Sequence, residues 1–122
     1  MGKESYLQGL QGEEIAEQHL IQHGYEIIEK NFHSQQGEID LIATQNNFLV
    51  FVEVKSYSFR SLGSPLSAVR KSKRQSIVHA ARTYIYRKGI KDQNCRFDVV
   101  TIYRRQDGSR AIDLYKNAFT IN

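Results

Sequence analysis

The chain has 122 residues, of which 40% are hydrophobic, and a net charge of +4. This length supports one hydrophobic core, so we expect a single domain over residues 1–122, and the one cysteine, Cys95, excludes an internal disulfide or a paired-cysteine zinc site. No apolar run is long enough to span a bilayer and no signal-peptide pattern opens the chain, which favours a cytoplasmic protein without a membrane partner.

The first predicted element is a helix from about residue 11 to residue 23, which Gly24 would end. Helical periodicity brings both Glu13 and Glu17 close to its apolar stripe, so the pattern does not choose which of the two acids faces the core. Residues 25–32 follow as the first predicted strand.

Residues 37–55 are predicted to form a β-hairpin. Two apolar runs flank a short polar break, in which Asn46 and Asn47 suit the central positions of a tight turn because Asn tolerates positive φ. In that turn Gln45 pairs with Phe48, and this pair fixes the register of the two strands.

The register gathers charged residues on one face of the hairpin. Because side chains alternate with a period of two, Asp40 is expected opposite Glu53, and Glu38 opposite Lys55 on the same face. Two facing carboxylates repel, so at least one pKa should rise unless a cation is present. Mg²⁺ would relieve the repulsion, since it prefers oxygen ligands and commonly takes one or two carboxylates. The alternative is a buried structural ion network in which Glu38 neutralises Lys55.

Apolar residues cover both faces of this hairpin. Such a hairpin belongs in the middle of a sheet that has helices packed on it, as in α/β proteins. We expect Ile39, Leu41 and Ala43 to share one face with Val50, Val52 and Val54, and Ile42, Leu49 and Phe51 to lie beyond the charges on the other.

The remainder of the chain is predicted to contain one helix and two strands. Ser64 and Pro65 suit the N-cap and first position of a helix over residues 65–88. Strands are expected at residues 96–103 and 111–115. The expected element order is therefore α-β-β-β-α-β-β.

Basic residues are concentrated around this second helix. Residues 1–54 contain nine acidic and two basic side chains, whereas residues 55–91 contain ten basic and no acidic ones. Such a block typically contacts polyanions, because each Lys or Arg beside a phosphate releases condensed counterions. We expect a nucleic-acid surface here, with a solvated basic helix as the alternative. The candidate contacts are Arg60, Arg70, Lys71, Lys73 and Arg74.

Taken together, the motifs between about residues 9 and 103 resemble the PD-(D/E)XK nuclease superfamily. Within it the chain is similar to the archaeal Holliday junction resolvases, and most closely to the YraN family of endonuclease-like proteins. The resemblance implies a restriction-endonuclease-like core with a central mixed β-sheet flanked by helices. It rests on Gly12-Glu13-Glu14-Ile15-Ala16, Gly24-Tyr25, Asn31, Gly37-Glu38-Ile39-Asp40-Leu41-Ile42, Phe51-Val52-Glu53-Val54-Lys55, Lys73 and Arg96-Phe97-Asp98-Val99-Val100.

The resemblance also implies roles for individual residues. Asp40 and Glu53 would bind Mg²⁺ or Mn²⁺, and Lys55 would activate water or stabilise the charge that develops on the phosphate. Glu13 takes the place of the family's acid on the first helix, both as a catalytic residue and as a metal ligand. Gln75 matches a helical polar residue that reaches the site and the nucleic acid.

These roles lead to the expected function. We expect a metal-dependent phosphodiesterase, an endonuclease that cuts branched or flapped DNA in repair or recombination, with RNA as a further candidate substrate. Cutting both strands at a junction would require a homodimer. The alternative is a non-catalytic nucleic-acid-binding module that has a nuclease-like fold.

Overall fold

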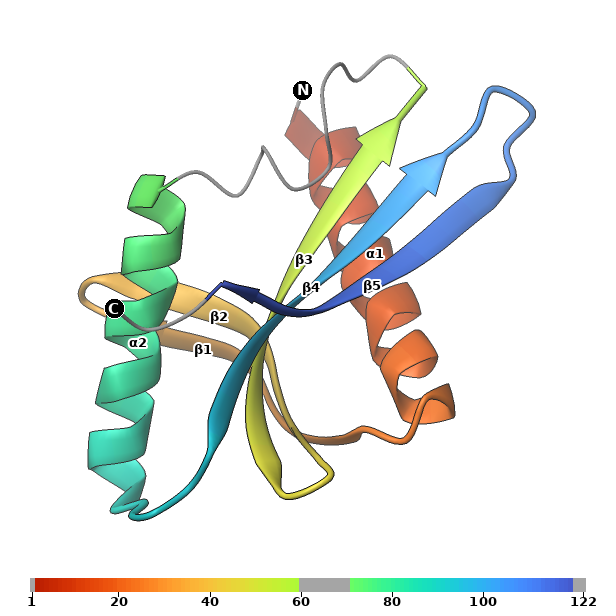
Figure 1. The fold of residues 1–122 in the computed structure, drawn as a ribbon. Helices are drawn as coiled ribbons and strands as arrows, with labels where there is room; N and C mark the ends of the chain where they lie inside the picture. The colour runs from red at the N-terminus through yellow and green to blue at the C-terminus, as the bar shows by residue number, and fades with distance from the viewer. Residues whose placement is uncertain (1, 60–70, 120–122) are drawn as a thin grey trace.

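The computed structural model of the protein describes residues 2–59 and 71–119, which form a five-stranded sheet with one helix on each face (Figure 1). The elements are α1 (Gly2–Gln22), β1 (Glu26–Ser34), β2 (Gly37–Gln45), β3 (Phe48–Ser58), α2 (Lys71–Lys88), β4 (Cys95–Arg104) and β5 (Arg110–Phe119). The sheet order is β1-β2-β3-β4-β5, with β3 and β4 parallel and the other pairs antiparallel. The predicted element order and mixed sheet are confirmed, and they agree with a restriction-endonuclease-like core.

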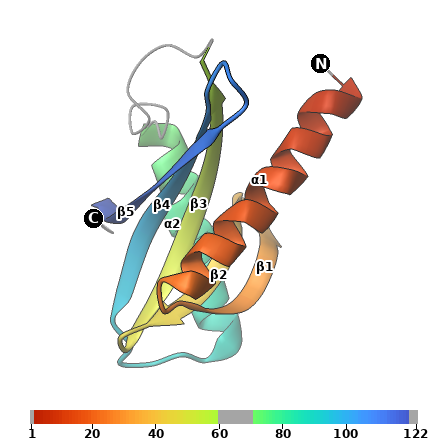
Figure 2. The same ribbon diagram turned by 90° about the vertical axis from the view of Figure 1, so that its right-hand side faces the viewer.

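Each helix covers a separate apolar cluster, because both faces of the central strands are hydrophobic. In Figure 2, α1 lies in front of the sheet and α2 behind it. The cluster under α1 contains Ala16, Leu20, Tyr25, Leu41, Ala43, Val50, Val52, Val100 and Ile102. The cluster under α2 contains Phe32, Ile39, Ile42, Leu49, Phe51, Ile77, Ala80, Ala81, Tyr84, Phe97, Val99 and Phe119.

The first helix ends where the sequence predicts. Gly24 has φ +88°, and the amide of Tyr25 donates to the carbonyl of Leu20 at 3.0 Å, which is the Schellman ending that glycine favours. The start of the helix differs from the prediction. The helix begins at Gly2 instead of residue 11. Its N-terminal part extends beyond the sheet (Figure 2), so no apolar stripe marks this start in the sequence.

The turn between β2 and β3 is also confirmed. Asn46 and Asn47 have φ values of +49° and +68°, and Gln45 pairs with Phe48. Two consecutive positive φ angles match the right-handed twist of a hairpin, and Asn adopts them at low cost.

The pairing of β2 with β3 stops partway along the hairpin. It runs from the turn to Leu41 opposite Val52, and beyond this point β2 turns away from β3 (Figure 1). We call this divergence the fork. The prediction that Ile39 shares a face with Leu41 is wrong, since Ile39 lies in the cluster under α2. At the fork β2 pairs with β1 alone, so β2 no longer follows the twist of β3.

A buried polar network ties the strands together at the opposite end of the sheet. Asp98 is 0% exposed and accepts hydrogen bonds from Arg96 Nε at 2.9 Å and Arg96 Nη2 at 2.9 Å. It also accepts from the Tyr25 hydroxyl at 2.7 Å and from the amide of Asn117 at 2.9 Å. Arg96 Nη2 donates further to Gln45 at 2.7 Å. Residues of three strands and of the turn after α1 thus meet around one satisfied carboxylate.

Helix α2 packs directly on the first residue of β2. A Cβ atom at Gly37 would overlap the backbone carbonyl oxygen of Ser76, so only glycine allows this approach. The predicted start of the helix at Ser64 and Pro65 lies outside the described residues. The last strand extends to Phe119, beyond its predicted end at residue 115. Within the described ranges, neither helix is both long and apolar enough to cross a membrane.

Candidate functional site

At the fork, a backbone amide of β3 donates its hydrogen bond to a side chain of β2. Beyond the last β2–β3 pair, the amide of Val54 donates to Asp40 Oδ2 at 2.7 Å. This bond holds the Asp40 carboxylate in the gap between the two strands. The local sequence therefore places an acid where the sheet opens.

Glu53 lies beside Asp40, and its side chain is almost completely buried. Only 5% of the residue is exposed. Lys55 Nζ lies 3.8 Å from one carboxylate oxygen and Lys73 Nζ lies 3.8 Å from the other. Both distances exceed those of a direct hydrogen bond, so the two lysines balance the charge without fixing the carboxylate in place.

Burial and repulsion raise the pKa of Glu53 to about 8. Loss of water around the carboxylate is the larger cause, followed by the negative charge of Asp40. The direct side-chain interaction with Asp40 raises this pKa further. The positive charges of Lys73 and Lys55 oppose the shift without cancelling it.

Helix α1 adds a third carboxyl group to this cluster. Glu13 is half-buried and hydrogen-bonded to Asp40, and burial, followed by the charge of Asp40, raises its pKa. Glu17, one turn further along the helix, instead pairs with Lys30 at 3.0 Å. Of the two acids that periodicity left open, Glu13 is the one beside Asp40.

Asn31 belongs to the site, although sequence reasoning did not include it among the site residues. Its side chain hydrogen-bonds to Glu13 and lowers the pKa of that carboxyl group, against the larger upward effects. It has φ +53° within β1 and lies between the pairs Lys30–Leu41 and Phe32–Ile39, so it faces Asp40 across the strands. Asparagine is among the few residues that tolerate this backbone conformation. The signal available was the family resemblance, in whose motifs Asn31 stands without an assigned role.

One predicted pair is wrong. Glu38 was expected opposite Lys55, but it pairs with His33 of β1 at 3.2 Å, at an exposed position. The fork is the reason, because β2 has left β3 before Glu38 is reached. Lys55 is therefore directed to Glu53.

The candidate nucleic-acid contacts fall into three groups. Lys73 lies in the carboxylate cluster. Lys71, Arg74 and Gln75 are exposed on the first turns of α2. Arg60 and Arg70 lie outside the described residues.

The cluster offers oxygen donors for a hard divalent cation. Over residues 2–59 and 71–119, no three His, Cys, Asp or Glu side chains are already arranged around one metal position. Glu53 is nevertheless buried beside the half-buried Asp40, and its pKa is raised, a conflict that a divalent cation would relieve. Mg²⁺ and Mn²⁺ fit this donor set, since one or two carboxylates with water and phosphate complete their coordination.

Comparison with known proteins identifies the family of the chain. Residues 12–102, which include the whole carboxylate cluster, match the family described as "Uncharacterised protein family UPF0102". A UPF0102 protein of Chlorobium phaeobacteroides is 37% identical over 115 residues, covering 94% of this chain and 91% of that relative. One from Saccharophagus degradans is 42% identical over 115 residues and covers 93% of each chain. One from Caldanaerobacter subterraneus is 46% identical over 95 residues and covers 78% of each chain.

The family match spans most of the chain, and the fold carries the Asp and Glu-x-Lys residues on adjacent strands. The chain belongs to the UPF0102 family, also called the YraN family, a nuclease-like group of the PD-(D/E)XK superfamily.

Proposed function

We propose that the protein is a metal-dependent phosphodiesterase that cuts nucleic acid, with branched or flapped DNA as its first candidate substrate. One observation carries the proposal: Glu53 is buried beside Asp40, its pKa is raised to about 8, and its two lysine partners stay 3.8 Å away. A carboxylate pair of this kind is ready to exchange its lysine contacts for a cation. Perturbed carboxylates in such clusters are typical of functional sites.

The residues of the chain have distinct roles in this reaction. Asp40 and Glu53 would hold the metal ion, which would polarise the phosphate and lower the pKa of the attacking water. Lys55, freed from Glu53, would donate hydrogen bonds to the oxygens on which negative charge develops. Glu13, with its raised pKa, would accept a hydrogen bond from the water and hold it in line with the phosphorus.

Lys73 and Asn31 extend these roles. Lys73 lies on α2, next to the exposed Lys71 and Arg74, so it connects the carboxylate cluster with the basic surface. A strand bound along that surface would have one phosphate within reach of Lys73. Asn31 would keep Glu13 directed toward Asp40. Symmetric cutting of a junction would in addition require two copies of the chain.

The second candidate function is a nucleic-acid-binding module without catalysis. It is favoured by one observation: Glu53 already has two lysine partners, and in the described part of the chain no third side chain completes a metal site. In that case Lys55 and Lys73 would serve as permanent counter-charges.

Metal binding and cleavage discriminate between the two. Wild type should cut at least one member of a panel of duplex, single-stranded, flapped and four-way DNA, with matching RNA, when Mg²⁺ or Mn²⁺ is added. Calorimetric titration with Mn²⁺ should give binding that Asp40→Asn greatly weakens, whereas the control Glu17→Gln should bind normally, because Glu17 pairs with Lys30. Equal heats for wild type and Asp40→Asn, together with no cleavage, would favour the binding module.

A further inference from the structure

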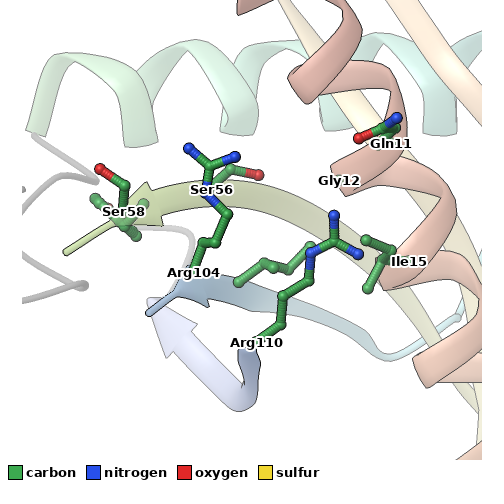
Figure 3. Close-up of a pocket in the computed structure, with 9 residues that line it drawn as sticks. Gln11, Gly12, Ile15, Ser56, Ser58, Arg104 and Arg110 are labelled. Atoms are coloured by element: carbon green, nitrogen blue, oxygen red, sulfur yellow. The ribbon is translucent and has the colours of Figure 1, made fainter. Parts of the chain in front are cut away.

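A second polar site lies under α1, next to the carboxylate cluster. A cavity of about 270 Å³ opens between α1 and the ends of β3, β4 and β5 (Figure 3). Among the described residues that line it none is acidic, and its polar groups include Gln11, Ser56, Ser58, Arg104 and Arg110. The cavity combines positive charge with hydroxyl and amide groups that donate hydrogen bonds.

The two arginines are placed as a pair. Arg104 of β4 is the direct partner of Arg110 in β5. In Figure 3 the side chain of Arg110 extends toward Ile15 of α1, and that of Arg104 toward Ser56 of β3. The planar guanidinium of Arg110 is well suited to charge-assisted hydrogen bonds with an anion in the cavity, and Arg104 adds positive charge beside it.

A glycine lets the helix close over this cavity. Gly12 is buried, and a Cβ atom at this position would lie 2.5 Å from Ser56 Oγ. Any larger residue would therefore crowd the hydroxyl at the wall of the cavity. Two residues that line the cavity are sequence neighbours of residues in the carboxylate cluster. On α1, Gly12 precedes Glu13, and on β3, Ser56 follows Lys55.

We propose that this cavity binds a backbone phosphate of the nucleic acid, at a nucleotide that flanks the one being cut. The inference rests on the proposed function for the identity of the ligand. Pockets that enclose whole ligands typically measure about 300–1,000 Å³. At about 270 Å³ the cavity suits a phosphate with part of its sugar better than a complete nucleotide. Neither Arg104 nor Arg110 belongs to the acid-free block, so this contact is separate from the surface on α2.

Arg110→Gln tests the proposal, with Arg105→Gln as its matched control. Both changes remove one positive charge from the β4–β5 hairpin, but Arg105 bonds to Ser109 in the turn at 3.2 Å and does not line the cavity. The probe is a fluorescently labelled flapped DNA in EDTA, and its dissociation constant is measured by anisotropy over a range of salt concentrations.

Arg110→Gln should weaken binding about tenfold, because it removes a charged hydrogen bond to phosphate. It should also flatten the slope of log affinity against log salt by about 1, as expected for one phosphate contact. Arg105→Gln should change the affinity by less than about twofold, since it leaves the phosphate contact intact. Equal effects of the two substitutions would overturn the proposal, and so would a wild type that does not bind DNA.

Gly12→Ala provides a second, independent test, because it crowds the cavity without changing charge. It should weaken DNA binding while the circular dichroism spectrum stays unchanged. Unchanged binding in a folded Gly12→Ala would contradict the proposal. If Gly12→Ala does not fold, the exposed Arg110 decides the question.

Failure of this proposal can be distinguished from failure of the proposed function. A wild type that binds DNA through Arg110 and cuts no substrate would contradict the phosphodiesterase and support the phosphate site. A wild type that cuts DNA, while Arg110→Gln and Arg105→Gln behave alike, would overturn the phosphate site alone. If both proposals hold, Arg110→Gln should raise KM and leave kcat nearly unchanged, because the flanking contact stabilises ground and transition states equally.

Discussion

Two buried carboxylates occupy adjacent strands and have opposite environments. Asp98 of β4 is 0% exposed and accepts hydrogen bonds from a guanidinium, a phenol and a backbone amide, all within 2.9 Å. Glu53 of β3 is 5% exposed, and its two lysine partners lie at 3.8 Å. A second carboxyl group, Asp40, stands next to Glu53.

The difference separates a structural ion pair from a functional cluster. At Asp98 the hydrogen bonds compensate for burial, so the network ties β2, β4, β5 and the turn after α1 into one unit. At Glu53 the compensation is incomplete, which raises its pKa to about 8. Proteins tolerate such a conflict mainly where binding or chemistry uses it.

The largest expected effect is on cleavage. Glu53→Gln keeps the shape of the side chain and removes a ligand charge, so metal-dependent cleavage of branched DNA should fall by at least about a hundredfold. DNA binding without metal should survive, and the melting temperature should not fall, because repulsion with Asp40 is gone. A Glu53→Gln that melts much earlier, beside a wild type that never cuts, would favour the structural ion network.

Asp98→Asn should have the largest effect on stability. It leaves the buried guanidinium of Arg96 without its counter-charge, which costs about 3–5 kcal/mol of the free energy of unfolding. Urea denaturation measures this, with Asp113→Asn as the control, because Asp113 is exposed on β5. If Asp98→Asn proved as stable as the control, Asp98 would not act as a structural ion pair, and the contrast with Glu53 would be wrong.

The pH dependence of stability sharpens the same contrast. The pKa of Glu53 is about 8 in the fold against an ordinary value of 4.5, so between these values the folded protein holds a proton that the unfolded chain has released. The stabilisation from this bound proton is complete below the ordinary pKa of 4.5 and is lost as pH rises through the folded-state pKa of about 8. The metal-free protein should therefore lose stability from pH 5 to pH 8, by at most about 1.4 kcal/mol per pH unit.

Thermal melting in EDTA over this pH range provides the measurement. Glu53→Gln is the control and should lose most of the slope. Saturating Mg²⁺ should reverse the loss at pH 8, since it binds the deprotonated pair and adds about 2.7 kcal/mol at a hundred times its Kd. Metal-free stability that rises steadily through this window would contradict the raised pKa.

The smallest expected effect separates two neighbouring residues of α2. Arg74 is exposed, so Arg74→Gln should flatten the salt dependence of DNA binding by about 1 and leave the pH dependence of melting unchanged. Lys73→Gln should alter both, because Lys73 lowers the pKa of Glu53 and its loss should raise that pKa further. If the two variants behaved identically, the interaction of Lys73 with Glu53 would be contradicted.

Local signals in the sequence account for most of the fold. The Asn46-Asn47 turn set the register of the hairpin, and Gly24 marked the end of α1. The position of Glu38 was mispredicted because a register extrapolated from the turn assumes continuous pairing. The fork interrupts that pairing, and beyond it β2 contacts β1 and α2, of which α2 is distant in the sequence.

The candidate site was predictable only where a motif carried it. Asp40 and Glu53 stood on adjacent strands of one hairpin, just beyond the last pair that the turn register predicts correctly, Leu41–Val52. Lys73 was assigned to the nucleic-acid surface by charge, and its contact with Glu53 depends on how α2 packs. The pairing of Arg104 with Arg110 needed the β4–β5 register, which composition does not encode.

The contact between Gly37 and Ser76 limits which substitutions this chain can accept. The obstructing atom is a backbone oxygen, so no exchange of side chains on α2 could make room for a larger residue at position 37. The glycine and the height of the helix above the sheet must therefore change together or remain fixed. Lys73 lies about one turn before Ser76, so drift at Gly37 would also move a lysine relative to Glu53. In evolutionary terms, a residue without a functional group constrains the geometry of the charges as strongly as the acids do.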